Sequence, residues 1–201
     1  MAVRSDVMQL RMLAIVMLAL LFGGCVTVSV ESKVGRDCTV ERYRTVINTT
    51  PLVYSLLVES AKEKGYQSLR DAILSDVEEE YRDRVMYDEV WSEDRVSIVV
   101  EGRNFVPEGG VRIWKDGEFL VYEDSSFANF SGITLHYYLE MPGKIVDSNA
   151  NVVKDNRAEW HLVGGSAVIY AKSEVPSIPG FDLLSGLTCI SLSAWCLARL
   201  R

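Results

Sequence analysis

Apolar and polar residues alternate along much of the middle of this 201-residue chain. The alternation is clearest at 26–32, where three valines are separated by Thr27, Ser29 and Glu31. A period of two places successive side chains on opposite faces of a β-strand. Further strands are predicted at 38–47, 96–100, 133–141, 158–163 and 167–172. We therefore expect a sheet that buries one face.

The segment 111–123 (VRIWKDGEFLVYE) predicts a β-hairpin. Asp116 and Gly117 suit a two-residue loop because both residue types accept the positive φ angles of such loops. This loop would pair Trp114 with Phe119 on one face. The apolar residues of the other face are expected to be buried: Val111, Ile113, Leu120 and Tyr122.

Two helices are predicted after the second strand. Thr50 and Pro51 are typical of a helix start, and Gly65 of its end. A Ser-x-x-Asp pattern at 68–71 favours a second helix, whose apolar positions continue to Val85. Short turns favour antiparallel neighbours. The predicted fold class is therefore α+β: an antiparallel sheet meander with two helices inserted after the second strand and packed on one face.

Residues 1–24 have the parts of an export signal peptide. Two arginines precede an uncharged apolar run at 12–22, and two glycines precede Cys25. The Gly-Gly-Cys ending resembles the lipobox of bacterial and archaeal lipoproteins, which implies cleavage by a signal peptidase and a lipid on Cys25. An uncleaved anchor over 12–30 is the alternative. Without the lipid, Cys25 is able to form a disulfide with Cys38 outside the cell.

The chain ends in a second targeting segment. Pro179, Gly180 and Phe181 open it, an apolar stretch follows, and two arginines lie in the last three residues. Residues 181–198 would form a transmembrane helix of about 27 Å, enough for a thin bilayer. The segment resembles the archaeal PGF-CTERM sorting domain. That resemblance implies an archaeal surface protein whose tail an archaeosortase-like enzyme removes. A permanent single-pass anchor with a basic cytoplasmic tail at 199–201 is the alternative.

Between these ends we expect one extracellular domain, residues 25–174, and a short linker at 175–180. A Met-Pro-Gly turn at 141–143 follows a predicted strand, and a later strand carries Trp160. This order resembles the family of the mycobacterial lipoprotein LppM. The resemblance implies a lipoprotein on the extracellular face of the cell membrane, with a non-enzymatic and lipid-binding domain.

Several other functions are not expected. A net charge of −7 opposes binding to nucleic acid, whose phosphates need a basic surface. The sequence has no Gly-x-Ser-x-Gly elbow, phosphate-binding glycine loop or His-Glu-x-x-His motif, so we expect no enzyme and no cofactor. Cysteine and histidine are not grouped, so no metal site is expected. His136 and His161 are expected to face solvent on different strands, with a pairing across the sheet as the alternative.

A wide apolar sheet face covered by two helices leads us to expect a lipid or another amphiphile between them. The residues expected to line this ligand are Leu56, Ile73, Ile98 and Trp160. The alternative is an envelope module for protein–protein interaction, or a structural one. It would use exposed aromatic residues, namely Trp91, Trp114 or Tyr138. Asn48 and Asn129 lie in Asn-x-Ser/Thr sequons and are candidate glycosylation sites.

Overall fold

The structure is a computed structural model that describes residues 26–175, apart from 76, 78, 108, 129 and 166. Within these residues no helix is both long and apolar enough to cross a membrane. Several predicted features lie outside the described residues and stay predictions. They are the signal at 1–24, the lipidation residue Cys25, the sorting motif Pro179, Gly180 and Phe181, the helix at 181–198, the tail at 199–201 and the sequon residue Asn129.

Strands dominate the described chain. In chain order they are β1 (Thr27–Val34), β2 (Val40–Thr49), β3 (Val85–Trp91), β4 (Val96–Phe105), β5 (Val111–Asp116), β6 (Phe119–Asp124), β7 (Phe130–Glu140), β8 (Ile145–Ser148), β9 (Val152–Lys154), β10 (Arg157–Gly165) and β11 (Ile169–Glu174). Three short helices separate β2 from β3. They are α2 (Pro51–Glu63), α3 (Leu69–Ser75) and the 3-10 helix η2 (Glu79–Arg84).

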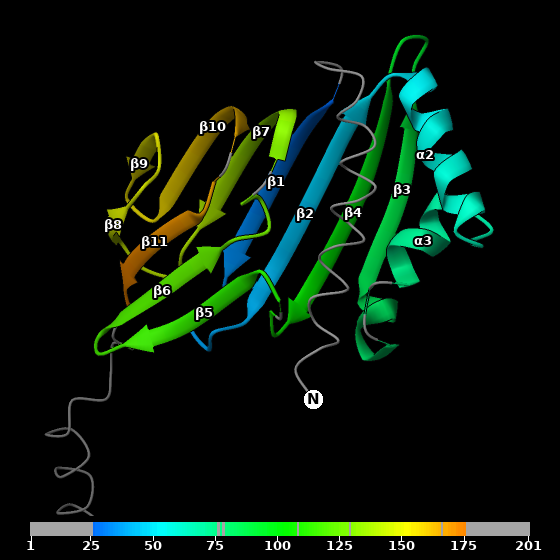
Figure 1. Cartoon of the computed structure of the whole chain (residues 1–201). Coiled ribbons are helices and arrows are strands. Elements are labelled where there is room, and N and C mark those ends of the chain that lie inside the picture. The colour runs from blue at the N-terminus through cyan, green and yellow to red at the C-terminus, as the bar shows by residue number, and fades with distance from the viewer. Residues whose placement is uncertain are drawn as a thin grey trace, which may run out of the picture.

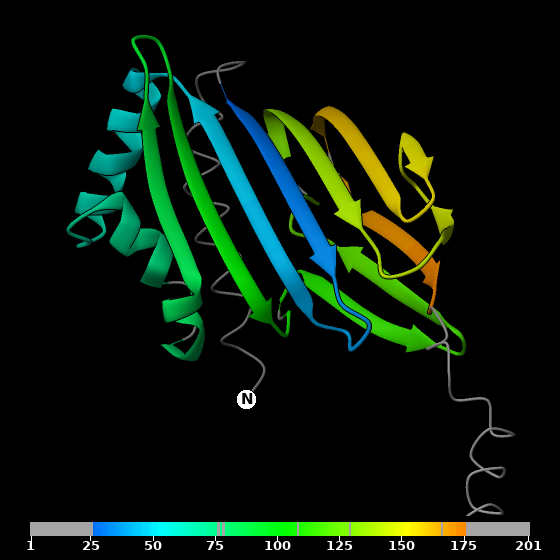
Figure 2. The same ribbon diagram turned by 180° about the vertical axis from the view of Figure 1, so that it is seen from behind.

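The strands form two sheets. The large sheet has the order β3-β4-β2-β1-β7-β10-β9, and the small sheet has the order β5-β6-β11-β8. Neighbouring strands are antiparallel except β1 and β7, which run parallel. The small sheet lies in front of the β1–β7–β10 part of the large sheet, and the helices lie beside β3 (Figure 1). Seen from behind, the large sheet has no described element over its other face (Figure 2).

The covered face of the large sheet carries the core. We call this side, which bears Val30, Ile98, Tyr137 and Trp160, the covered face; all four side chains are at most 2% exposed. Alternate residues of the small sheet complete the layer because both sheets present apolar side chains with a period of two. The apolar residues of the small sheet that are fully buried against this face are Leu120, Tyr122, Ile169 and Ala171.

Helix α2 packs on the same face. Thr50 caps it by accepting a hydrogen bond from the Val53 amide at 3.4 Å, as the sequence predicts. Tyr54 then attaches the helix to β3. Its hydroxyl donates to Glu89 at 2.7 Å, and its ring contacts that of Trp91 edge-on at 4.7 Å between centroids. Burial and the Glu89 carboxylate raise the pKa of Tyr54 to about 12.

The second predicted helix is too long. Helix α3 ends at Ser75, and Val85 begins β3 instead of closing a helical stripe. The Ser68 hydroxyl does accept from the Asp71 amide at 3.0 Å, so the predicted cap is confirmed. Residues 85–91 pair with β4 because the sheet provides a partner strand, and this tertiary pairing overrides the helical spacing.

The predicted α+β class is wrong, because the described chain is mostly β and forms two sheets. A meander assumes that consecutive strands are neighbours, whereas β7 returns to lie parallel to β1, and the hairpin 111–124 leaves the large sheet to cover it. The hairpin itself is confirmed. Of the face expected to be buried, Leu120 and Tyr122 are buried, whereas Val111 and Ile113 are half-buried against the core. Val121, on the other face, is buried as well. The loop of the hairpin is Gly117-Glu118 rather than Asp116-Gly117, so Trp114 lies opposite Val121 instead of Phe119.

Candidate functional site

The four residues predicted to line a ligand lie in two separate parts of the core. Ile73 and Ile98 are buried near the helices, and Leu56 is half-buried on α2. Trp160 lies on β10, and three strands separate β10 from the β4 strand of Ile98. Its Nε1 donates to the Asn149 side chain at 2.9 Å, and its ring packs edge-on against a tyrosine. The lining role of these residues stays a prediction.

A buried polar network joins the two sheets. Tyr122 and Tyr137 hydroxyls lie 2.5 Å apart, and Tyr137 donates to Asp124 at 2.9 Å. Tyr43 donates to the same oxygen of Asp124 at 3.2 Å, and the Ser32 hydroxyl lies 3.3 Å from that of Tyr122. Burial first, and then the charge of Asp124, raise the pKa of Tyr137 and Tyr122 well above their usual value. The network links strands of both sheets in the interior.

The opposite side of the large sheet is polar. We call the side that bears Glu31, Arg42, His136 and Glu159 the open face. The parallel register of β1 and β7 places Glu31 beside Tyr138, and the antiparallel register of β7 and β10 places Tyr138 beside Glu159. Residues far apart in the sequence therefore meet on one surface.

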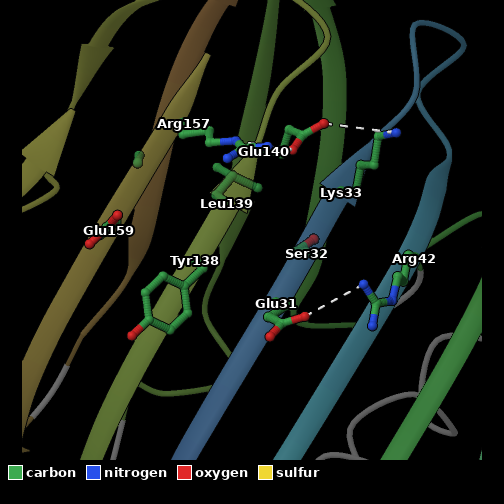
Figure 3. A pocket seen from close by; sticks show the side chains of 10 residues that line it. Glu31, Ser32, Lys33, Arg42, Tyr138, Leu139, Glu140, Arg157 and Glu159 are labelled. Carbon is green, nitrogen blue, oxygen red and sulfur yellow. Dashed lines mark hydrogen bonds and ion pairs between the residues drawn. The ribbon is translucent and has the colours of Figure 1, made fainter. Parts of the chain in front are cut away.

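A hollow of about 370 Å³ lies on the open face across β1, β7 and β10 (Figure 3). Its charged side chains form ion pairs: Glu140 lies 3.0 Å from Arg157 and 3.8 Å from Lys33. Arg42 lies 3.6 Å from Glu31. Besides these side chains, Tyr138 presents an aromatic ring. The hollow thus offers donors, acceptors and one aromatic surface, with its charges balanced.

One carboxylate beside the hollow is nearly buried. The Glu101 side chain is 5% exposed and lies between arginines of β2 and β4. It pairs with Arg103 at 2.6 Å and with Arg42 at 3.2 Å. Burial alone would raise the pKa of Glu101, but the hydrogen bonds from these two guanidinium groups lower it overall. This carboxylate therefore holds Arg42 in place at the rim of the hollow.

The two histidines meet next to the hollow. His136 and His161 lie directly opposite each other on β7 and β10, with their Nδ1 atoms 2.8 Å apart. His161 Nε2 lies 3.5 Å from a carboxylate oxygen of Glu159. The ring of Tyr138 packs edge-on against that of His161, with 6.0 Å between the ring centroids. They lie on the open face, as expected, and the pairing across the sheet is formed.

The exposed aromatic residues do not form one patch. Trp91 is on β3 against helix α2, Trp114 is on the small sheet, and Tyr138 is in the hollow. The sequon residue Asn48 lies within β2, and its side-chain oxygen accepts from Ser97 at 2.6 Å. Cys38 is half-buried, with a left-handed φ of 65°, and its predicted partner is outside the described residues.

The residues of the hollow were missed in the sequence because their meeting depends on the pairing of β1 with β7. One signal was present. In β1 the polar residues between the valines include Glu31 and Lys33, and near the end of β7 Tyr138 and Glu140 alternate with an apolar residue. Polar residues at alternate positions of two strands indicate an exposed face, but they do not show which strands are neighbours.

Comparison with known proteins gives one relative and one solved structure. An uncharacterized protein of Archaeoglobus fulgidus is 54% identical over an alignment covering 89% of this chain and 90% of that protein. The NMR structure of the folded domain of LppM from Mycobacterium tuberculosis is similar with a TM-score of 0.50 and 12% identity. It covers 78% of this chain and 93% of that domain. No protein-family model matches. The described chain therefore shares the fold of the LppM domain.

Proposed function

We propose that this chain, which belongs to the same family as the uncharacterized Archaeoglobus fulgidus protein, is a binding protein of the archaeal cell envelope. It is exported, held at the outer face of the membrane, and has no catalytic activity. Two features of its sequence support this location: the export signal with its lipobox-like Cys25, and the Pro179-Gly180-Phe181 segment before an apolar stretch. The shared fold with a lipoprotein domain agrees with it.

We further propose that the domain binds the polar head group of an amphiphile on its open face. The single observation that carries this is the hollow across β1, β7 and β10. It is the place where side chains from strands far apart in the sequence converge without a described element covering them. The interior offers less support, because Ile73, Ile98 and Trp160 are buried in the core cluster.

The charge balance of the hollow favours a neutral, hydroxyl-rich head group, such as that of a glycolipid. An anionic group would have to compete with Glu31 and Glu140 for the cationic side chains. Hydroxyl groups instead accept from Arg157 and donate to a carboxylate at the same time, which gives charge-assisted hydrogen bonds. Tyr138 adds a flat apolar surface against which a sugar ring packs.

Intact-mass measurements on protein purified from its own membranes test both parts. A mature chain that begins at a lipid-modified Cys25 and ends near Pro179 is the expected result. Mass that is present in the native spectrum and lost on denaturation would be the bound amphiphile. A full-length chain without added mass would contradict lipidation and processing, and it would favour an interaction module on a permanent anchor.

The hollow is tested separately with vesicles that contain or lack a neutral glycolipid. Tyr138→Ala should reduce glycolipid-dependent binding about tenfold, because the aromatic surface under the sugar is lost. Trp114→Ala is the matched control, since Trp114 is similarly exposed (40% against 37%) but lies on the small sheet. Equal loss with both variants, or equal binding to both kinds of vesicle, would contradict the assignment of the hollow.

A further inference from the structure

The fold brings together the only two histidines of the chain. They are 25 positions apart in sequence, yet β7 and β10 place them directly opposite each other on the open face. The His161 side chain is 42% exposed, so the pair is accessible from solvent. Nothing in the packing of the core requires this arrangement, because both side chains point away from it.

We propose that His136 and His161 form a two-nitrogen site for a divalent transition-metal ion, with copper(II) preferred. Imidazole nitrogens bind such ions at about 2.0 Å. Two ligands at 90° are then about 2.8 Å apart, which is the edge of the square-planar arrangement that copper(II) and nickel(II) favour. The two Nδ1 atoms are 2.8 Å apart and the ring centroids 5.1 Å apart, so the two nitrogens point at each other, and both rings must turn before their lone pairs converge on one ion. Copper(II) is preferred because it binds nitrogen ligands more strongly than the other divalent first-row ions do.

The ion would lie between the two rings once they have turned. In the neutral pair one Nδ1 donates and the other accepts, so one proton lies between the rings. When both Nδ1 atoms bind the ion, this proton moves through solvent to the exposed Nε2 of the same ring. Both imidazoles stay neutral, and no proton is released overall. Water molecules complete the coordination.

Glu159 supports the site without being a ligand. It lies 3.5 Å from His161 Nε2, on the opposite side of the ring from Nδ1. A carboxylate in that position accepts the Nε2 proton, keeps Nδ1 free to bind the ion, and orients the ring. Among the described residues no group of three or more His, Cys, Asp or Glu side chains converges. The site is therefore a bidentate one, and it does not depend on the proposed head-group binding.

Copper(II) titration of the full chain, followed by electron paramagnetic resonance, tests the proposal. Thiols are first blocked with N-ethylmaleimide, because the sequence has four cysteines. One ion should bind per chain and show coupling to two imidazole nitrogens. His136→Gln and His161→Gln should each leave one imidazole nitrogen and weaken binding at least tenfold. Glu159→Gln should retain both nitrogens but weaken binding about tenfold.

Val163→Gln is the matched control. Val163 lies two residues from His161 on the same face of β10 and is 83% exposed, so a glutamine there changes the surface but not the pair. This variant should bind copper(II) as the parent chain does. The proposal is overturned if the doubly substituted chain, with glutamine at both histidines, keeps the same signal. It is also overturned if the parent chain shows one imidazole or none.

Discussion

The covered and open faces of the large sheet are made by the same strands but differ in what holds their side chains. Against the covered face, the Asp124 carboxylate of the small sheet is enclosed and has protein donors in place of water. On the open face, ion pairs such as Arg157–Glu140 remain in water. Removing a hydrogen bond or ion pair of similar length therefore changes the free energy of unfolding more on the covered face than on the open face.

This difference separates stability from binding within one sheet. Substitutions on the covered face leave cavities or unpaired polar atoms. The close-packed interior rearranges too little to fill these cavities or to provide new hydrogen-bond partners. On the open face, water fills the space that a substitution leaves and forms hydrogen bonds with the remaining polar groups. The open face can therefore carry a hollow and a histidine pair at little cost to the free energy of folding. We expect substitutions on the covered face to lower the free energy of unfolding more than substitutions on the open face do.

The largest effect is expected from Asp124→Ala. The substitution leaves the hydroxyls of Tyr43 and Tyr137 and the amide of Ser126 without their acceptor in a buried place. Three unsatisfied donors should lower the free energy of unfolding by about 4 kcal/mol, measured by urea denaturation. Asp116→Ala is the control in the same hairpin. Its ion pair with Lys172 is exposed, so the loss should stay below about 1 kcal/mol. Similar losses would remove the distinction between enclosed and solvated groups.

A second comparison uses two apolar residues on adjacent strands. Ile98 is 1% exposed on the covered face, and Ile98→Ala should cost about 3 kcal/mol through lost contacts and a residual cavity. Val90 of β3 is 55% exposed on the open face, and Val90→Ala should cost below about 0.5 kcal/mol. Thermal unfolding of both variants measures the difference. A cost above about 2 kcal/mol for Val90 would show that something covers the open face in the intact protein.

Local features, such as caps and turns, were predicted from the sequence more accurately than the pairing of strands. The cap at Thr50 and the hairpin near Gly117 depend on interactions within a few residues, and both are confirmed. The α+β meander was wrong because no local pattern shows that β7 pairs with β1 across about a hundred intervening residues. The division into two sheets depends on the same long-range choice.

The candidate site was incompletely predicted for the same reason. The position of His136 and His161 on the exposed side follows from alternation alone, but their contact depends on the register of β7 and β10. A shift of that register by two residues would keep both on the open face and separate them. Asp124 was missed because a carboxyl group at a hairpin end is usually solvated, and here the small sheet encloses it.

Glu101 differs from the other charged residues of the open face because its side chain is nearly buried. Glu101→Gln removes two charge-assisted hydrogen bonds and should cost about 2 kcal/mol at pH 7. The folded-state pKa of Glu101 is lowered below the unfolded value of about 4.3. Its stabilisation is therefore complete above that value and is lost as the pH falls through the folded-state pKa.

Denaturation of parent and Glu101→Gln chains between pH 7 and pH 2 should show this loss, with the two stabilities converging at low pH. Glu31→Gln is the matched control, because Glu31 also pairs with Arg42 and Arg44 but its side chain is 45% exposed. It should change stability by less than about 1 kcal/mol across the range. A difference for Glu101 that grows as the pH falls would contradict a lowered pKa.

The smallest effect is expected at the hollow itself. A double-mutant cycle with Arg157→Gln and Glu140→Gln should give a coupling of about 0.5 kcal/mol, because the Arg157 side chain is 69% exposed. High salt should remove most of it. So weak a coupling leaves both side chains able to change partners when a head group binds. A coupling above about 1.5 kcal/mol that survives 1 M salt would instead make the hollow a rigid structural element. The open face would then resemble the covered one.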